Sequence, residues 1–222
     1  CEQSGVSPHI TRHERCDRWR HVIEMINDKS DGFLDDLLPN VTIVGQAASV
    51  GCVDGLSRTA LSQINADLPG VVALFGPGCS NDVAQLTNAA WRQESGMDSV
   101  VISGQSTAVS LNNDVEYPKL IRALPNEQWI AKGLVVLCSE LQWTHVAVVY
   151  EPNLWGRSSK DEFIAELERT GGVLLVEHEL DFGNSSSPSC ATIDAARVLR
   201  DLVRHRAHVT FMAIHPQCQR EL

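Results

Sequence analysis

The chain has 222 residues, 43% of them apolar, and a formal net charge of −10 at pH 7. It is long enough for one large or two small domains with a real core. The acidic balance and scattered basic residues exclude an extended polyanion such as DNA as a partner. No apolar run approaches the roughly 20 residues that would span a bilayer.

The cysteines and the glycosylation sequons favour an extracellular or luminal setting. Seven cysteines are many for a cytosolic protein of this size, and no two of them form a C-x-x-C pair. Two N-x-[ST] sequons lie in turn-like or polar segments, and we expect glycans on Asn40 and Asn184. The chain opens on a cysteine in a polar stretch without an apolar signal segment, so we interpret it as a fragment of a longer protein.

The first half of the chain predicts helices alternating with short strands. Trp19, Val22, Ile23 and Ile26 recur at helical spacing and form an apolar stripe. Helices are expected over 16–29, 54–70 and 81–94, and strands over 41–47, 71–75 and 99–103.

The second half repeats this pattern after an extended segment and a proline turn near 121–128. The next helix has an apolar face that includes Ile130, Leu134, Val135 and Leu141, with Cys138 expected as a buried free thiol. Later helices are expected over 158–172, with a capping box of Ser159 and Glu162, and over 191–206. Strands are expected over 144–150, 173–180 and 209–214. Strands alternating with helices predict an α/β fold of mostly parallel sheets flanked by helices.

The corner "LFGPGCSNDVAQL", residues 74–86, is the first candidate site, because ligands bind beyond the carboxyl ends of parallel strands. It has neither a P-loop pattern nor a G-x-G-x-x-G pattern, so a nucleotide-phosphate loop is excluded. Ser80 places a hydroxyl at the mouth of a helix, and Ser103, Ser106 and Thr107 follow the next strand. Two polar loops on one sheet edge suit a small ligand that carries a carboxylate. A glycine-rich turn that only closes a βα unit is the plainer alternative.

Several segments, read in order, resemble one family. "VVALFGPGCSNDVAQL", "VVISGQSTAVSL", "YPKLIRALPNEQ" and "LQWTHVAVVYEPNLWGRSS" are similar to the receptor ligand-binding region. This region is shared by class C G-protein-coupled receptors, natriuretic-peptide-type cyclase receptors and bacterial amino-acid-binding proteins. The resemblance runs from about Cys16 to the C-terminus, and "PGCS" looks most similar to metabotropic GABA receptors.

The resemblance implies a two-lobed clamshell, of the type I periplasmic-binding-protein kind, that closes on a ligand between its lobes. The first lobe is expected over 1–122 without its N-terminal strand, and a partial second lobe over 123–222. The family's carboxylate-binding hydroxyls match Ser80, Ser106 and Thr107. Trp155 stands where the family commonly has a tyrosine, which leaves the ligand's identity open. The family's corner disulfide matches Cys52 and Cys79.

The function expected from this resemblance is an extracellular, non-catalytic sensor of an amino-acid-like small molecule on a membrane receptor. It is expected to act as a homo- or heterodimer, anchored by segments outside this chain, without a cofactor or a metal site. The alternatives are the sensor of a receptor cyclase and a solute-binding protein of a transporter. His9 with His13 and His205 with His208 lack a third metal ligand nearby, and no G-x-S-x-G hydrolase motif is present. Cys1, Cys16, Cys190 and Cys218 are all available for further pairing.

Overall fold

The computed structural model describes residues 12–32, 34–36, 38–48, 56–180 and 194–214. Within these ranges the strands form two three-stranded parallel sheets, ordered β1-β2-β3 and β5-β4-β6. The first contains β1 (Ala73–Phe75), β2 (Val100–Ser103) and β3 (Leu120–Arg122); the second contains β4 (His145–Tyr150), β5 (Val173–Glu179) and β6 (Thr210–Ala213). We call the parts around them the first and second lobe. The predicted α/β fold with parallel sheets is confirmed.

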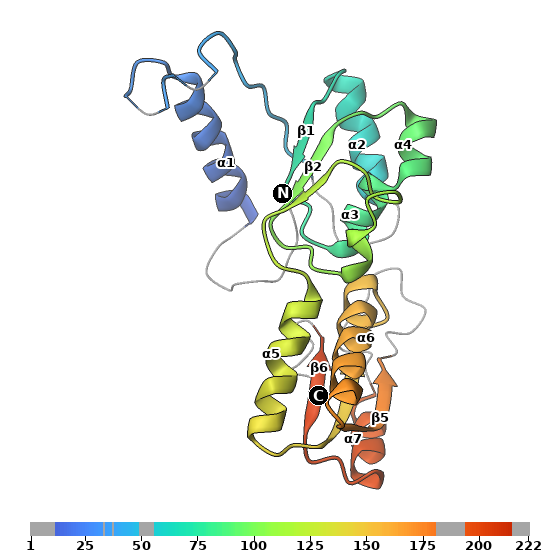
Figure 1. Cartoon of the computed structure of the whole chain (residues 1–222). Helices are drawn as coiled ribbons and strands as arrows, with labels where there is room; N and C mark the ends of the chain where they lie inside the picture. The colour runs from blue at the N-terminus through green and yellow to red at the C-terminus, as the bar shows by residue number, and fades with distance from the viewer. Residues whose placement is uncertain (1–11, 33, 37, 49–55, 181–193, 215–222) are drawn as a thin grey trace.

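The first lobe covers one face of its sheet with three helices (Figure 1). These are α2 (Leu56–Asp67), α3 (Ser80–Thr87) and α4 (Ala89–Ser95). Leu61, Leu86 and Val101 form the buried core between helices and sheet. On the other side of the sheet, α1 (Arg12–Asn27) touches β1 through Trp19, whose ring lies 5.8 Å from that of Phe75. The predicted apolar stripe of α1 is only partly covered: Trp19 is 51% exposed and Val22 39%, whereas Ile23 and Ile26 are half-buried.

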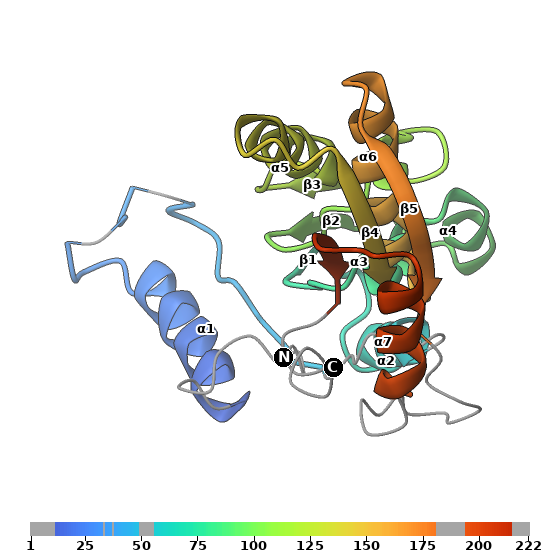
Figure 2. The same cartoon turned by 90° about the horizontal axis from the view of Figure 1, so that it is seen from below.

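The second lobe has helices on both faces of its sheet (Figure 2). Helices α5 (Glu127–Glu140) and α6 (Leu154–Arg169) pack on one face, where they enclose Val146, Val148 and Phe163. Helix α7 (Ala195–Arg204) packs on the other through Val198. Strand β4 lies in the centre of this sheet, which explains its continuous apolar sequence. Cys138 is a buried free thiol, as predicted, and burial raises the pKa of that thiol.

Two predictions about the first lobe are wrong. Residues 41–47 form no strand, because the backbone of Ile43 pairs with a side chain instead of a neighbouring strand. The Ile43 N–H donates to Asn27 Oδ1 at 2.7 Å.

The single helix expected over 81–94 is two helices, broken at Asn88. There the backbone leaves helical values (φ −56°, ψ 122°), and the Asn88 side chain accepts from Trp91 N–H as the N-cap of α4.

The predicted start of the helix over 158–172 is wrong as well. Helix α6 begins at Leu154, and the side-chain oxygen of Asn153 caps it by accepting from Gly156 N–H at 2.7 Å. Ser159 therefore lies more than a turn inside the helix and is buried instead of capping it. The earlier start matters for function, since it brings the first turn of α6 against the first lobe.

Candidate functional site

Four consecutive strands end near the contact between the lobes. Ser80 follows β1, Thr107 follows β2, Glu127 follows β3 and Trp155 follows β4. Parallel strands present their carboxyl ends at one edge of a sheet, where α/β proteins bind ligands. Three of these four residues are predicted site residues, and the fourth, Glu127, is not.

The corner after β1 is a tight turn that leads directly into α3. Gly76 adopts a positive φ of +96°, which favours glycine, and its N–H donates to the carbonyl of Ile102 at 3.0 Å. Cys79 caps α3 without a side-chain hydrogen bond and is disulfide-bonded. Ser80 is the first residue of α3 and only 3% exposed. Its hydroxyl accepts a long bond, 3.4 Å, from the N–H of Ala108, so it faces the loop after β2.

Ser103 and Ser106 form a hydroxyl pair that closes the end of β2. Ser106 donates to Ser103 Oγ at 2.8 Å, and Ser103 donates to the carbonyl of Pro77 at 2.5 Å. Both residues are buried. The hydroxyl of Ser106 thus points back to the strand end and ties the two loops together, whereas Thr107 points toward the second lobe.

Thr107, Glu127 and Trp155 form one buried polar cluster. The Thr107 hydroxyl donates to Glu127 Oε1, and Trp155 donates its indole N–H to the same oxygen at 2.7 Å. The backbone supports this pairing, because Glu127 N–H donates to the carbonyl of Thr107 at 2.9 Å. Glu127 is only 4% exposed. A carboxylate this deeply buried needs hydrogen-bond donors or a cation around it. Here the donors are Thr107 of the first lobe and Trp155 of the second, so the Glu127 carboxylate connects predicted site residues of both lobes.

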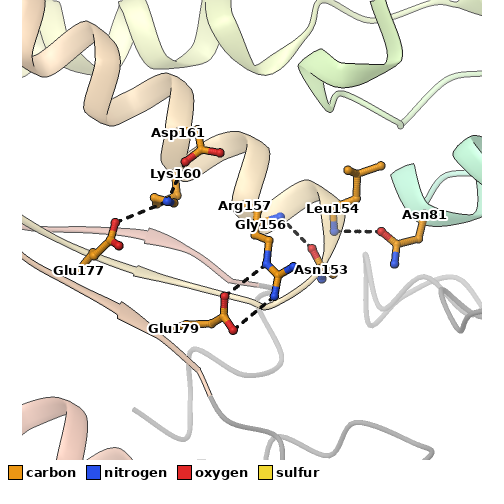
Figure 3. Close-up of polar contacts among 9 residues, drawn as sticks. All are labelled: Asn81, Asn153, Leu154, Gly156, Arg157, Lys160, Asp161, Glu177 and Glu179. Carbon is orange, nitrogen blue, oxygen red and sulfur yellow. Dashed lines mark hydrogen bonds and ion pairs between the residues drawn. The ribbon is translucent and has the colours of Figure 1, made fainter. Parts of the chain in front are cut away.

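The start of α6 contacts the first lobe beside this cluster. Leu154 donates its backbone N–H to Asn81 Oδ1 at 2.9 Å (Figure 3). Ser158, further along α6, accepts from the N–H of Val109 at 2.8 Å. The Leu154 side chain packs on a buried first-lobe cluster that contains Val83 and Leu111. These contacts join the two lobes on α6 beside Trp155, which belongs to the polar cluster.

Ion pairs fix α6 on the side away from the first lobe. Figure 3 shows Arg157 beside Glu179 of β5, with Nε 3.3 Å from Oε2, and Lys160 between Asp161 and Glu177. Lys160 also lies over the ring of Tyr150. The Arg157 pair is exposed and contributes little to stability.

Two shallow, open depressions among the described residues lie elsewhere, one against Gly32 and Asp36 and one between residues 46–48 and α2. Neither includes a residue of the polar cluster. No three His, Cys, Asp or Glu side chains within the described ranges are grouped as metal ligands, and no described helix is long and apolar enough to cross a bilayer. In this conformation the side chains of Leu154, Trp155 and Glu127 fill the contact between the lobes.

The predictions made for Cys52, Asn184 and Asn40 are not tested by the structure. Cys52 and Asn184 lie outside the described residues, so the Cys52–Cys79 pairing and a glycan on Asn184 stay predictions. Asn40 is exposed in a turn, closed by a hydrogen bond from Val41 N–H to the carbonyl of Leu38. It is accessible to a glycosyltransferase, and its modification also stays a prediction.

We expect a peptide map of the unreduced chain to contain a Cys52–Cys79 cross-linked peptide. A disulfide closing a loop of this length contributes about 3–4 kcal/mol in the chain-entropy model, so reduction should lower the midpoint of thermal unfolding. Cys138 is the internal control, because a buried thiol should react with an alkylating reagent only after denaturation. Finding Cys79 joined to another cysteine would remove the predicted pairing.

Glu127 is the residue of the polar cluster that sequence reasoning missed. It lies in the quoted segment "YPKLIRALPNEQ", five residues after the end of β3. The rule that led to Ser80 and Thr107, polar side chains at the carboxyl ends of parallel strands, applies equally to β3. Asn81 and Ser158 were also missed, and nothing in their local sequence distinguishes them from other polar residues at helix ends.

Comparison with known proteins places nearly the whole chain in one family model. Residues 26–222 match the model described as receptor family ligand binding region. The chain is 29% identical over 112 residues to the G-protein coupled receptor family C group 6 member A of Carassius auratus, covering 50% of this chain and 12% of that receptor. It is 29% identical over 76 residues to metabotropic glutamate receptor 4 of Macaca fascicularis, covering 34% of this chain and 8% of that receptor. The matched segments of the chain therefore cover about a tenth of the length of these relatives.

Proposed function

Because the chain belongs to the family described as receptor family ligand binding region, we propose that it senses a small amino-acid-like ligand for a membrane receptor. Its relatives named above are receptors of the G-protein-coupled class C, which favours this function over a transporter's solute-binding protein or a cyclase sensor. The ligand would bind between the lobes and act by drawing them together. The membrane anchor and the signalling partner would belong to the complete receptor.

The chemistry at the lobe contact supports a zwitterionic ligand. Glu127 offers a buried carboxylate that accepts hydrogen bonds, and it suits an ammonium group because a buried negative charge is stabilised by a nearby cation. Ser80 offers a hydroxyl at the N-terminus of α3, where the helix dipole favours a negative group. An amino acid carries both charges on one small molecule, so it would satisfy both sites together.

The contacts of α6 support closure as the response. Asn81 with Leu154 and Val109 with Ser158 join the lobes without any ligand atom. A ligand that adds its own bonds to both lobes would bind this closed form better than an open one, and so would shift the population toward it. For the ligand to enter, Leu154 and Trp155 would have to move away from the first lobe.

Ligand binding can be tested by isothermal titration of the whole chain with the L-α-amino acids and γ-aminobutyrate. We expect heat of binding from at least one of them, and about tenfold weaker binding in Ser80→Ala and Thr107→Val, each of which removes one hydroxyl. Ser106→Ala should have a smaller effect, because the Ser106 hydroxyl is bonded to Ser103.

The matched control for this experiment is Ser110→Ala, since Ser110 lies exposed on the short helix η1 (Val109–Asn112), three residues after Thr107. This variant should bind as tightly as the wild-type chain. Binding that is unchanged in both Ser80→Ala and Thr107→Val would contradict the proposed site, and no binding of any of these amino acids would contradict the proposed ligand class.

A further inference from the structure

The Trp155 side chain provides one of the donors to the Glu127 carboxylate. Its indole N–H donates to Glu127 Oε1 at 2.7 Å, although Trp155 lies in the first turn of α6 and Glu127 begins α5. Glu127 is only 4% exposed, whereas Trp155 is half-buried. A buried carboxylate is therefore bonded to a side chain that reaches the solvent.

Glu127 is held more firmly by the first lobe than by α6. Its backbone N–H donates to the carbonyl of Thr107 at 2.9 Å, and its side chain accepts from the Thr107 hydroxyl. If α6 moves away from the first lobe while these two bonds persist, the bond from Trp155 is the one that breaks. The Trp155 indole thus links α6 to a carboxylate that the first lobe positions.

The indole N–H satisfies Glu127 as a hydrogen-bond acceptor without compensating its charge. The Trp155 and Thr107 donors are both neutral groups. Within the described residues, Glu127 takes part in none of the ion pairs. An ammonium group would add a Coulomb attraction to the hydrogen bond, and such an attraction is little screened at a buried site. An ammonium group is therefore a better donor for this carboxylate than the indole is.

We propose that Trp155 is an internal competitor of the ligand. Before a ligand binds, its indole N–H occupies the position on Glu127 that the ligand's ammonium group takes afterwards. The inference rests on the proposed function, because it assigns a regulatory role at the same site. A ligand binds only to molecules in which the indole has left Glu127, so the apparent affinity falls in proportion to the fraction of such molecules. Trp155 thereby sets the ligand concentration at which the site fills.

The contact between Trp155 and Glu127 can be tested in the whole chain by ¹H–¹⁵N correlation spectroscopy. The five tryptophans give five indole N–H signals, and Trp155→Phe identifies the Trp155 signal by its loss. We expect this proton to exchange with water more slowly than that of Trp129, which is 63% exposed. Glu127→Ala should make the exchange fast while the other four signals stay in place. Equally fast exchange at Trp155 and Trp129 in the wild-type chain would overturn the proposal.

Competition with the ligand can be tested by isothermal titration of Trp155→Phe, which keeps an aromatic ring but lacks the N–H donor. We expect it to bind the amino acid that binds wild type about tenfold more tightly, as when Glu127 is accessible in about a tenth of wild-type molecules. Trp129→Phe is the matched control, because it makes the same change at an exposed position and should bind as wild type does.

Equal or weaker binding by Trp155→Phe would contradict the competition, since a residue that only supports the site or contacts the ligand cannot raise affinity when its donor is removed. In the wild-type chain, saturating amino acid should also make the Trp155 indole exchange fast. If no amino acid binds either chain, the proposed function fails, and the indole exchange still decides whether Trp155 occupies Glu127. The two failures therefore give different results.

Discussion

Replacing Glu127 with alanine is expected to cause the largest loss of ligand binding of any single substitution in the chain. The variant removes the carboxylate that accepts from both the Thr107 hydroxyl and the Trp155 indole N–H, and it leaves these two donors buried without their acceptor. Hydrogen bonds to a charged group contribute about 1.5–3 kcal/mol each. We therefore expect affinity to fall by about a hundredfold, measured by isothermal titration with whichever amino acid binds the wild-type chain.

Two further variants identify the reason for that loss. Glu127→Gln keeps an oxygen that can accept from Trp155 but removes the negative charge, so it should bind a zwitterionic ligand nearly as poorly as the alanine variant. Glu168 is an exposed glutamate on α6, outside the polar cluster. Glu168→Gln removes one negative charge there, and this variant should bind the ligand as tightly as wild type. If Glu127→Gln bound as tightly as wild type, Glu127 would hold the lobes together without contacting the ligand's ammonium group.

Replacing Gly156 with alanine is expected to produce the largest loss of stability. A β-carbon at Gly156 would lie 2.3 Å from the carbonyl oxygen and 2.9 Å from the amide nitrogen of Glu151. Both are backbone atoms, so the first turn of α6 or the end of β4 must shift. We expect the free energy of unfolding to fall by about 2–4 kcal/mol, measured by chemical denaturation. Since Leu154 and Trp155 share that turn, ligand binding should weaken as well.

Gly133→Ala is the control for this prediction, because it makes the same chemical change inside a helix of the same lobe. Its added β-carbon meets no atom within 4 Å, so the variant should be more stable than wild type by about 0.5–1 kcal/mol. Equal losses of stability in Gly133→Ala and Gly156→Ala would show that the close approach of α6 to Glu151 does not determine the cost.

Local sequence predicted most of the elements but misplaced several of their ends. Apolar runs such as 144–150 identified the strands, because a strand buried on both faces needs apolar residues throughout. The cap of a helix is harder to predict, since several polar residues near its start are equally suitable. Ser159 was a reasonable cap by sequence. In the structure Asn153 fills that position, and Gly156, whose N–H it accepts from, lies close to the backbone of Glu151.

The apolar pattern also failed to show which face of α5 is covered. Ile130 and Leu141 belong to the predicted apolar face, yet they are 47% and 46% exposed. Sequence periodicity identifies the buried face of a helix only when the opposite face is polar. Because α5 has apolar residues on both faces, its packing on the sheet of the second lobe decides which of them are buried.

The sequence by itself determined the α/β class and the strand ends that carry Ser80 and Thr107, because apolar periodicity and turn residues act over short distances. The family followed from the resemblance of successive segments to a known ligand-binding region. Only the tertiary structure decided that Glu127 joins Thr107 to Trp155 across 28 residues of chain, and that Asn81 meets Leu154 across 73. Such pairs depend on how two separate sheets are set against each other. That arrangement is fixed by packing between distant elements, which no local pattern of residues contains.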